Sequence, residues 1–347
     1  MSREGVVVRI SRKSLLISGV ILLLFFVGVT YELPYYIYKP GMVDSLDHVV
    51  EIEEGNESEG HMHLVTVSGS QATPIQYIAA KLLSYHEIMP LNDVRPEGMS
   101  DKEYMHQQLM MMEGSQNTSK YVAYKAANKK AELKYDGVYV MNVVEDMPAE
   151  EKLEVGDEIE KVDGRKIKEA KDLTSYVGSK KPGEEVTFSI IREEEELDET
   201  IELTSFQDDT DKVGVGIQLV TEETVDVEPE IHFSSGNIGG PSAGFIFALE
   251  IYNQLTKADI TKGYEIVGTG EIDYEGNIHR IGGIDKKVVA AHRAGIDLFF
   301  APSENGKSDS NYIVAKHTAE SLDTDMEIIP VETFDDALEY LDEMDPK

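Results

Sequence analysis

An uncharged apolar segment near the N-terminus constrains this chain more than any other feature. Residues 15–29 read LLISGVILLLFFVGV, and four basic residues precede them: Arg3, Arg9, Arg12 and Lys13. Extended to residues 14–31, the segment has about 18 residues, just enough for a helix to cross the hydrocarbon core of a bilayer. Basic flanks stay on the cytoplasmic side. We therefore predict a cytoplasmic N-terminus over residues 1–13, a single-pass anchor over 14–31 and an extracellular remainder.

A cleaved signal peptide is the alternative interpretation of this segment. Such a peptide has an apolar region of about 7–15 residues and ends at a small-x-small cleavage site. After Val29 the chain reads Thr-Tyr-Glu-Leu-Pro-Tyr-Tyr, which offers no such site. An uncleaved anchor is favoured, followed by a linker over residues 32–60.

The composition argues against several classes of function. The chain has 66 acidic and 32 basic residues, for a formal net charge of −34, and it has no cysteine. The negative surface would repel phosphate backbones, so we expect no nucleic-acid partner. Without cysteine there is no thiol nucleophile, thiolate zinc site or disulfide. His61 and His63 share a strand face but lack a third ligand, so we expect neither metal nor cofactor.

Residues 132–206 have the pattern of a small β-rich module with one short helix. Four segments in order resemble a PDZ domain of the type found in secreted bacterial proteases: Asp136-Gly-Val-Tyr-Val, Met147-Pro-Ala, Val155-Gly-Asp-Glu-Ile and Val162-Asp-Gly. The resemblance implies a peptide groove between the strand after Gly137, with Val138 and Tyr139, and the helix around Leu173. An extended peptide would add there as an extra strand. The alternative is a module that only packs against its neighbour.

The segment from Ile231 to Gly244 carries the strongest chemical signal. It is a strand-like run that enters a loop with four glycines and a proline within nine positions, and then continues into an apolar helical pattern. Ser242 would lie on the first turn of that helix, among unpaired backbone N–H groups. We predict that Ser242 is a nucleophile, with N–H groups near Gly240 and Pro241 stabilising an oxyanion. A simple helix cap is the alternative, but a cap does not need this loop.

A serine nucleophile needs a base, and Lys287 is the first candidate. A helix beginning near Asp285 places Lys287 with Ile284 and Ala291 on the apolar face, whereas Lys286 points outward. A lysine held against apolar surface loses hydration, which favours its neutral form. Lys287 is therefore predicted to be the general base and Lys286 to be a solvated charge.

A different base is predicted if the serine belongs to a nucleophile elbow. Gly240-Pro-Ser-Ala-Gly244 fits G-x-S-x-G, which would recruit Asp285 and then His292 or His317. That fold requires a large parallel sheet before the serine, and here a β-rich module intervenes. The chain after Ser242 is also too short to complete such a sheet.

Three ordered motifs resemble the proteolytic domain of Lon proteases: Gly-Pro-Ser-Ala-Gly at 240–244, Val-Gly-Thr-Gly-Glu-Ile at 267–272, and the run from Ile278 through Gly-Gly-Ile-Asp-Lys-Lys to Ile296. With the anchor and the PDZ-like module, the chain resembles the membrane-anchored Lon-like proteases of Gram-positive bacteria. The resemblance implies that Ser242 and Lys287 form a catalytic dyad and that Thr269 hydrogen-bonds the lysine. One departure is Gly239, where Lon enzymes often carry aspartate.

The expected fold is α+β: a Lon-type domain built from residues 61–131 and 207–347, with the PDZ module of residues 132–206 inserted and one transmembrane helix. No G-x-x-x-x-G-K-[ST] motif occurs, because Ala301 stands where the first glycine before Gly306-Lys-Ser should be. We therefore expect an ATP-independent endopeptidase acting on flexible or unfolded exported proteins and peptides, compatible with a homo-oligomer. The alternative is a non-catalytic scaffold that binds peptides through its PDZ module.

Overall fold

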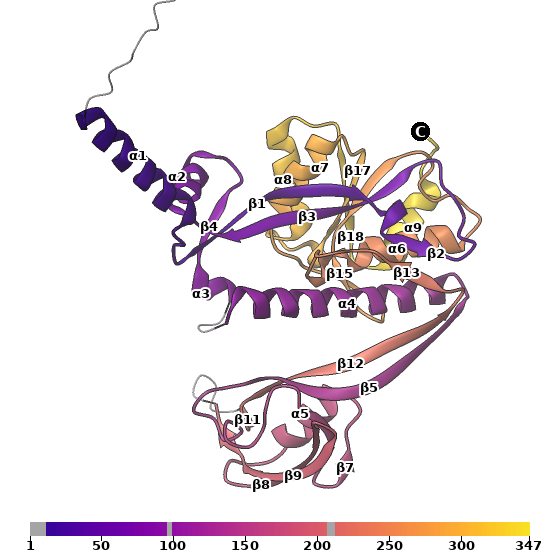
Figure 1. Ribbon diagram of the computed structural model, residues 1–347. Coiled ribbons are helices and arrows are strands. Elements are labelled where there is room, and N and C mark those ends of the chain that lie inside the picture. Colours follow the sequence, from indigo (N-terminus) through magenta and orange to yellow (C-terminus); the bar gives the residue numbers. More distant parts are fainter. Residues whose placement is uncertain (1–11, 96–98, 207–211) are drawn as a thin grey trace, which may run out of the picture. The chain divides into compact units, whose positions relative to one another are not determined.

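The computed structural model describes residues 12–95, 99–206 and 212–347, which form two compact units (Figure 1). The first unit contains residues up to Ala127 and from Pro229 onward, and the second spans Asn128–Glu228. The second unit is thus inserted into the chain of the first. The cytoplasmic N-terminus predicted for residues 1–13 lies outside the described residues, except for Arg12 and Lys13, which begin the first helix.

The first unit is built around a six-stranded sheet in the order β18-β17-β14-β3-β1-β4. These strands are β18 (Glu327–Val331), β17 (Leu298–Pro302), β14 (Glu265–Gly268), β3 (His61–Gln71), β1 (Tyr35–Ser45) and β4 (Glu87–Pro90). Neighbours from β18 to β3 pair in parallel, whereas β3, β1 and β4 pair antiparallel. Two short pairs complete the unit's strands: β2 (Val50–Ile52) with β13 (Ile231–Phe233), and β15 (Glu271–Ile272) with β16 (Ile278–His279).

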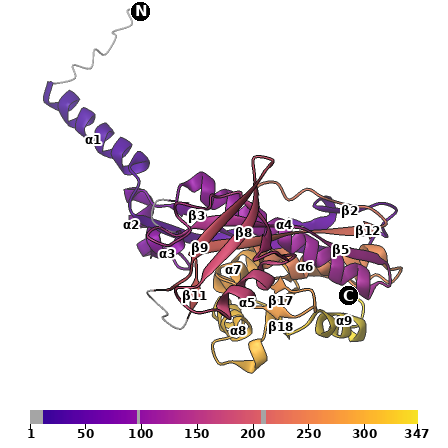
Figure 2. The same ribbon diagram turned by 90° about the horizontal axis from the view of Figure 1, so that it is seen from below.

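Helices cover both faces of this sheet (Figure 1; Figure 2 shows the same elements from below). On one face, α7 (Ile284–Ala294) and α8 (Asn311–Leu322) pack on a cluster that includes Val65, Val267 and Phe299. On the other, α6 (Gly244–Leu255) and α9 (Phe334–Glu343) meet Phe300 through the rings of Phe245 and Tyr340. Neighbouring positions of one strand face opposite sides, so helices on both faces explain why Val267 and its neighbour Ile266 are both fully buried.

The remaining helices of the unit lie N-terminal to the second unit. They are α1 (Arg12–Thr30), α2 (Pro74–Leu82), α3 (Leu91–Val94) and the long α4 (Asp101–Ala126). Ser100 and Glu103 form a capping box that begins α4, and α4 packs along α6. Helix α1 is long and apolar enough to cross a membrane and is almost entirely exposed. A signal sequence near an N-terminus can have the same length and apolar composition.

The linker predicted over residues 32–60 is wrong for Tyr35–Ser45, which form strand β1 inside the main sheet between β3 and β4. Pro40 and Gly41 interrupt the strand's alternation, and the register shifts between Pro40 and Val43. Proline and glycine are normally read as ending a strand, but a bulge accommodates them within a paired one. The sequence pattern therefore indicated loop where pairing on both sides maintains a strand.

The second unit is a small sheet folded around one helix. Its strands run in the order β12-β5-β6-β8-β9: β12 (Ile217–Glu228), β5 (Lys130–Val143), β6 (Glu158–Val162), β8 (Glu185–Arg192) and β9 (Glu195–Glu202). Short β7 (Arg165–Lys166) pairs with β6, and β10 (Thr204–Ser205) pairs with β11 (Val213–Gly214). Helix α5 (Ala170–Gly178) contributes Leu173 and Val177 to the core, which also contains Val138 and Phe188.

Candidate active site

Ser242 lies in a single turn of 3-10 helix, Pro241–Ala243, directly before α6. Gly240 precedes this turn with φ 90° and ψ 156°, a conformation that only glycine adopts without strain. The turn is also fixed to the end of β14, because Gly270 N–H donates to Ser242 O (3.0 Å) and Phe245 N–H donates to Gly270 O (3.2 Å). The half-buried serine is thereby held at the carboxyl end of a central parallel strand.

Lys287 reaches the same place from the first turn of α7. Its Nζ lies 2.8 Å from Ser242 Oγ and 2.8 Å from Thr269 Oγ1, and Thr269 follows the last residue of β14. The Thr269 hydroxyl in turn donates to Ser242 O at 3.1 Å. The structure therefore brings together the three side chains that the sequence singled out for chemistry.

The Lys287 side chain is shielded from solvent. The side chain is 3% exposed, and burial lowers the pKa of Lys287 to about 7. Desolvation acts against the charged amine, and no acidic group contributes to the shift. A substantial fraction of this amine is therefore neutral at physiological pH and able to accept the Ser242 proton.

The neighbouring Lys286 is also buried, so the prediction of an outward, solvated side chain is wrong. It is 4% exposed, and its Nζ lies 2.7 Å from Glu87 and 3.2 Å from Asp285. Helix periodicity put Lys286 on the far side from Lys287, but strand β4 carries Glu87 to that side. The two adjacent lysines thus differ in their partners: one amine meets carboxylates, and the other meets hydroxyls.

The predicted oxyanion donors need correction. Pro241 has no backbone N–H, and Gly240 N–H donates to Gln108 O of α4 at 2.8 Å. The N–H groups of Ser242 and Ala243, at the start of the helical turn, are the better candidates. The conformation of Gly240 serves to aim this turn, and its N–H attaches the turn to α4.

Helix α4 supplies supports that sequence reasoning missed. Ser115 Oγ donates to Pro241 O (2.9 Å), and Ser119 Oγ donates to Gly244 O (2.7 Å). The available signal was two serines four residues apart, hence on one helix face, within a 26-residue helix with little amphipathic character. Gln108 explains the glycine at 239 as well, because a Cβ there would lie 2.6 Å from Gln108 Cβ. An aspartate at 239 would not fit beside α4.

The histidines required by the nucleophile elbow do not contact the serine. His292 lies on the last turn of α7, and His317 is exposed on α8. Asp285 interacts with Lys286. Among the described residues, Lys287 is the titratable side chain that hydrogen-bonds to Ser242 Oγ. The geometry favours a lysine base over the elbow.

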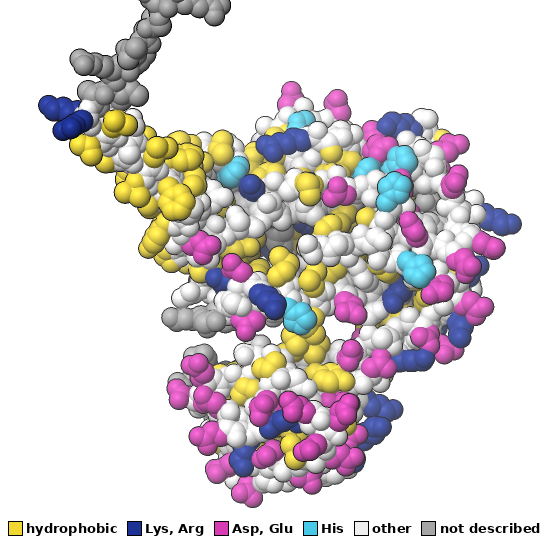
Figure 3. Space-filling view, in the orientation of Figure 1, with side chains coloured by type: hydrophobic (Ala, Val, Ile, Leu, Met, Phe, Trp, Pro, Cys, Tyr) yellow, Lys and Arg dark blue, Asp and Glu magenta, His cyan; other side chains and the backbone are white. Residues whose placement is uncertain are grey.

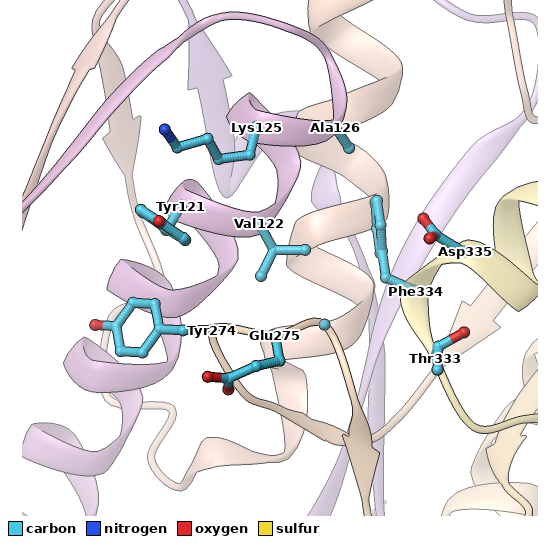
Figure 4. A pocket seen from close by; sticks show the side chains of 10 residues that line it. Tyr121, Val122, Lys125, Ala126, Tyr274, Glu275, Thr333, Phe334 and Asp335 are labelled. Carbon is cyan, nitrogen blue, oxygen red and sulfur yellow. The ribbon is translucent and has the colours of Figure 1, made fainter.

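A cavity of about 270 Å³ lies elsewhere in the first unit (Figure 4). It is lined by α4, by the turn after β15 and by the start of α9, with Tyr121, Lys125, Tyr274 and Phe334 among its residues. Ser242, Thr269 and Lys287 do not line it. It is therefore separate from the candidate active site.

In the second unit, the prediction assigns the peptide groove to the wrong strand, the one that contains Gly137, Val138 and Tyr139. These residues lie in β5, where all three pair with β12 and Tyr139 also pairs with Glu158 of β6, so this part of β5 is not the open edge of the sheet. Val138 and Leu173 are core residues, 0% and 3% exposed.

The edge strand beside α5 is β12, which has β5 as its one partner strand among the described residues. The N–H of Ala170, the first residue of α5, donates to Thr221 Oγ1 of β12 at 2.9 Å. Ile217 and Leu219 are partly buried against the same core as α5. The space between β12 and α5 is thus where an added strand would find both a free edge and apolar contacts.

Comparison with known proteins identifies both units. The model of the Lon protease (S16) C-terminal proteolytic domain matches residues 199–342, and a PDZ domain model matches residues 113–203. The chain contains a PDZ domain and a Lon-type proteolytic domain. This confirms the expected α+β fold class. The domain limits of 61–131, 132–206 and 207–347 remain predictions, and the compact inserted unit extends further, to Glu228.

Similar curated proteins are Lon proteases. The chain is 31% identical over 165 residues to Lon protease of Clostridioides difficile (45% of this chain, 20% of that protein). It is 44% identical over 79 residues to Lon protease of Dictyoglomus thermophilum (22% and 10%). The chain thus spans a fifth or less of the length of these two relatives.

Solved structures similar to part of this chain include a PDZ domain. The PDZ domain of the SdrC-like protein of Listeria monocytogenes is 37% identical, covering 26% of this chain and 93% of that one, with a TM-score of 0.24.

Thr269 offers a direct test of how the Lon-type site is organised. Thr269→Val removes the hydroxyl that accepts from Lys287 Nζ while keeping the side-chain shape. We expect kcat/KM for an unstructured peptide to fall about 10–100-fold, because the amine loses the partner that orients it toward Ser242. Thr269→Ser keeps the hydroxyl and should remain within about threefold of the parent. Equal losses in both variants, measured at matched thermal stability, would show that packing and not the hydroxyl matters.

Proposed function

We propose that this protein is a nucleotide-independent serine endopeptidase with a Ser242–Lys287 dyad, anchored by α1 with its catalytic domain outside the membrane. The observation that carries the proposal is a dry lysine amine 2.8 Å from a serine hydroxyl at the start of a helix. The Lon-type match supports proteolysis as the chemistry, and the absence of a phosphate-binding motif supports action without a nucleotide motor. The basic residues before α1 support export of the domain that follows.

In the proposed reaction, neutral Lys287 accepts the Ser242 proton as Oγ attacks the peptide carbonyl carbon. The N–H groups of Ser242 and Ala243 donate to the resulting oxyanion. The protonated lysine gives its proton to the leaving amine, and the C–N bond breaks to leave an acyl ester on Ser242. Water then hydrolyses the ester, with Lys287 again acting as base. Thr269 holds the amine in line throughout by accepting one of its hydrogens.

The PDZ domain gives this proposed peptidase a route for recruiting substrate. An extended peptide would pair with the free edge of β12 and place apolar side chains against Ile217 and Leu219, beside α5. Substrates would then be flexible segments or unfolded exported chains, because a strand can be added only from backbone that is not already paired.

Covalent labelling tests the proposed function against the rival scaffold. A fluorophosphonate probe should label the purified full-length protein in detergent without added nucleotide, and mass spectrometry should place the adduct on Ser242. Ser242→Ala should remain unlabelled. The same preparation should cleave an intrinsically unstructured protein such as casein. A folded protein that is neither labelled nor active on casein would establish the scaffold instead.

A further inference from the structure

Helix α2 has two apolar faces, although a surface helix needs only one. Ala80 and Tyr77 face the core, where they pack with Ile37 of β1 and Ile88 of β4. On another face lies a stripe that we call the outer stripe: Ile75, Ile78 and Leu82, together with Leu83 just after the helix. The spacing of three and four residues places the three helical members in one line. Ile78 is 62% and Leu82 82% exposed, so no described part of the chain covers the stripe's centre.

The outer stripe is continuous with the apolar helix α1. Gly28, near the end of α1, is buried, and its Cβ position lies 3.1 Å from the Ile75 side chain, the first member of the stripe. The backbone bond from Leu33 N–H to Ala72 O (2.8 Å) ties the chain after α1 to the start of α2. In Figure 3, the hydrophobic surface of α1 continues onto the flank of the domain at this point. If α1 crosses a bilayer, the outer stripe lies where α1 leaves it.

The charges around the outer stripe suit a lipid surface. The chain has 66 acidic residues in 347, yet none occurs between Glu59 and Glu87. The single basic side chain of α2, Lys81, extends toward Tyr77, with its Nζ 4.7 Å from the centre of the Tyr77 ring. Tyr31, at the end of α1, is 60% exposed, as is typical of tyrosines at the level of the headgroups. A strongly acidic protein thus presents an uncharged apolar face where its anchor enters the membrane.

We propose that α2 is an interfacial helix whose outer stripe inserts into the outer boundary of the same bilayer that α1 spans. The proposal rests on the membrane anchoring of α1 in the proposed function. Lipid then covers Ile78, Leu82 and Leu83, and the β4 edge of the sheet faces the membrane. The Lon-type domain is held at the surface in a fixed orientation and does not swing on a tether.

The absence of tryptophan from the chain permits a clean test by depth-dependent fluorescence quenching. Three single-tryptophan variants of the full-length protein are reconstituted into vesicles of phosphatidylcholine and phosphatidylglycerol. They are Ile78→Trp in the outer stripe, Leu22→Trp in α1, and Glu339→Trp. Glu339 is exposed on α9, which packs at the β18 edge of the sheet, opposite the β4 edge beside α2. Because each site is exposed, all three variants should fold and keep peptidase activity.

The expected result has two parts. Lipids brominated near the headgroup end of their acyl chains should quench about half of the Ile78→Trp emission, whereas lipids brominated deeper should quench Leu22→Trp more strongly. Glu339→Trp should not respond to either lipid. Quenching of Leu22→Trp without quenching of Ile78→Trp would overturn the interfacial helix and leave the anchor standing. Quenching of neither would remove the anchor and the proposal together.

A second copy of the chain is the competing occupant of the outer stripe. In that case Ile78→Trp would be shielded from aqueous acrylamide and yet remain insensitive to brominated lipid. That combination also overturns the proposal.

Discussion

Replacing Lys287 with methionine is expected to lower kcat/KM for an unstructured peptide by at least about 10³-fold and to stabilise the protein. The loss follows from removal of the base that activates Ser242. The gain follows from the pKa of Lys287, which folding lowers from 10.5 to about 7. The unfolded chain binds this proton more tightly than the folded chain does. At neutral pH, well below 10.5, burying the amine therefore costs folding free energy, whereas burying a neutral side chain carries no such cost. We expect the free energy of unfolding at pH 7 to rise by about 1–3 kcal/mol.

The adjacent Lys286 provides the matched control. Lys286→Met removes an amine of equal burial, but this amine interacts with Glu87 and Asp285. Activity should stay within about threefold of the parent, and stability should fall by about 1–2 kcal/mol because two carboxylates lose their partner. Denaturant unfolding should therefore show stability changes of opposite sign for the two neighbouring variants. Peptide cleavage should show a large loss of activity in Lys287→Met alone. More than a tenth of the parent activity in Lys287→Met would contradict the assigned base.

The pH dependence of kcat/KM is the second large expected effect. The neutral form of Lys287 is the reactive one, and burial sets the pKa of Lys287 at about 7. Below that value the neutral fraction falls tenfold for each pH unit, so kcat/KM at pH 5 should be about 100-fold lower than its plateau above pH 8. Circular dichroism at each pH would establish that the chain remains folded over this range.

A histidine base would titrate in the same region, so the profile needs variants that separate the two. His292→Gln and His317→Gln should keep both the rate and the pH dependence. Lys287→Arg should be inactive at every pH up to 10, because a guanidinium does not deprotonate in that range. A profile that disappears in a histidine variant would restore the nucleophile-elbow mechanism.

Much of the candidate site could be predicted because the relevant signals are local. The glycines around Ser242 indicate a tight loop before a helix, and helical spacing places Lys287 on the apolar face of its own helix. The PDZ and Lon-type motifs likewise lie in short ordered segments, which is why the fold class could be predicted. Thr269, Ser242 and Lys287 then meet because two helices begin beside the end of β14.

The sequence-based predictions were wrong where a property depends on how two elements pair or pack together. Whether Tyr35–Ser45 is linker or strand depends on β3 and β4 pairing with it on both sides. Whether β5 or β12 can accept a peptide depends on which of them lies at the edge of the sheet. The partners of Lys286 and Gly240 come from β4 and α4, which lie far away in sequence.

The amino-acid sequence by itself determined the chemistry available to this protein: a serine at a helix start, a lysine on an apolar helix face and an apolar N-terminal helix. The tertiary structure decided how dry the lysine is, which backbone N–H groups remain free and which strand edge stays open. The physical reason is that helix and strand periodicity are set by neighbours along the chain. Solvation and hydrogen-bond pairing are set instead by residues distant in sequence that the fold places next to each group.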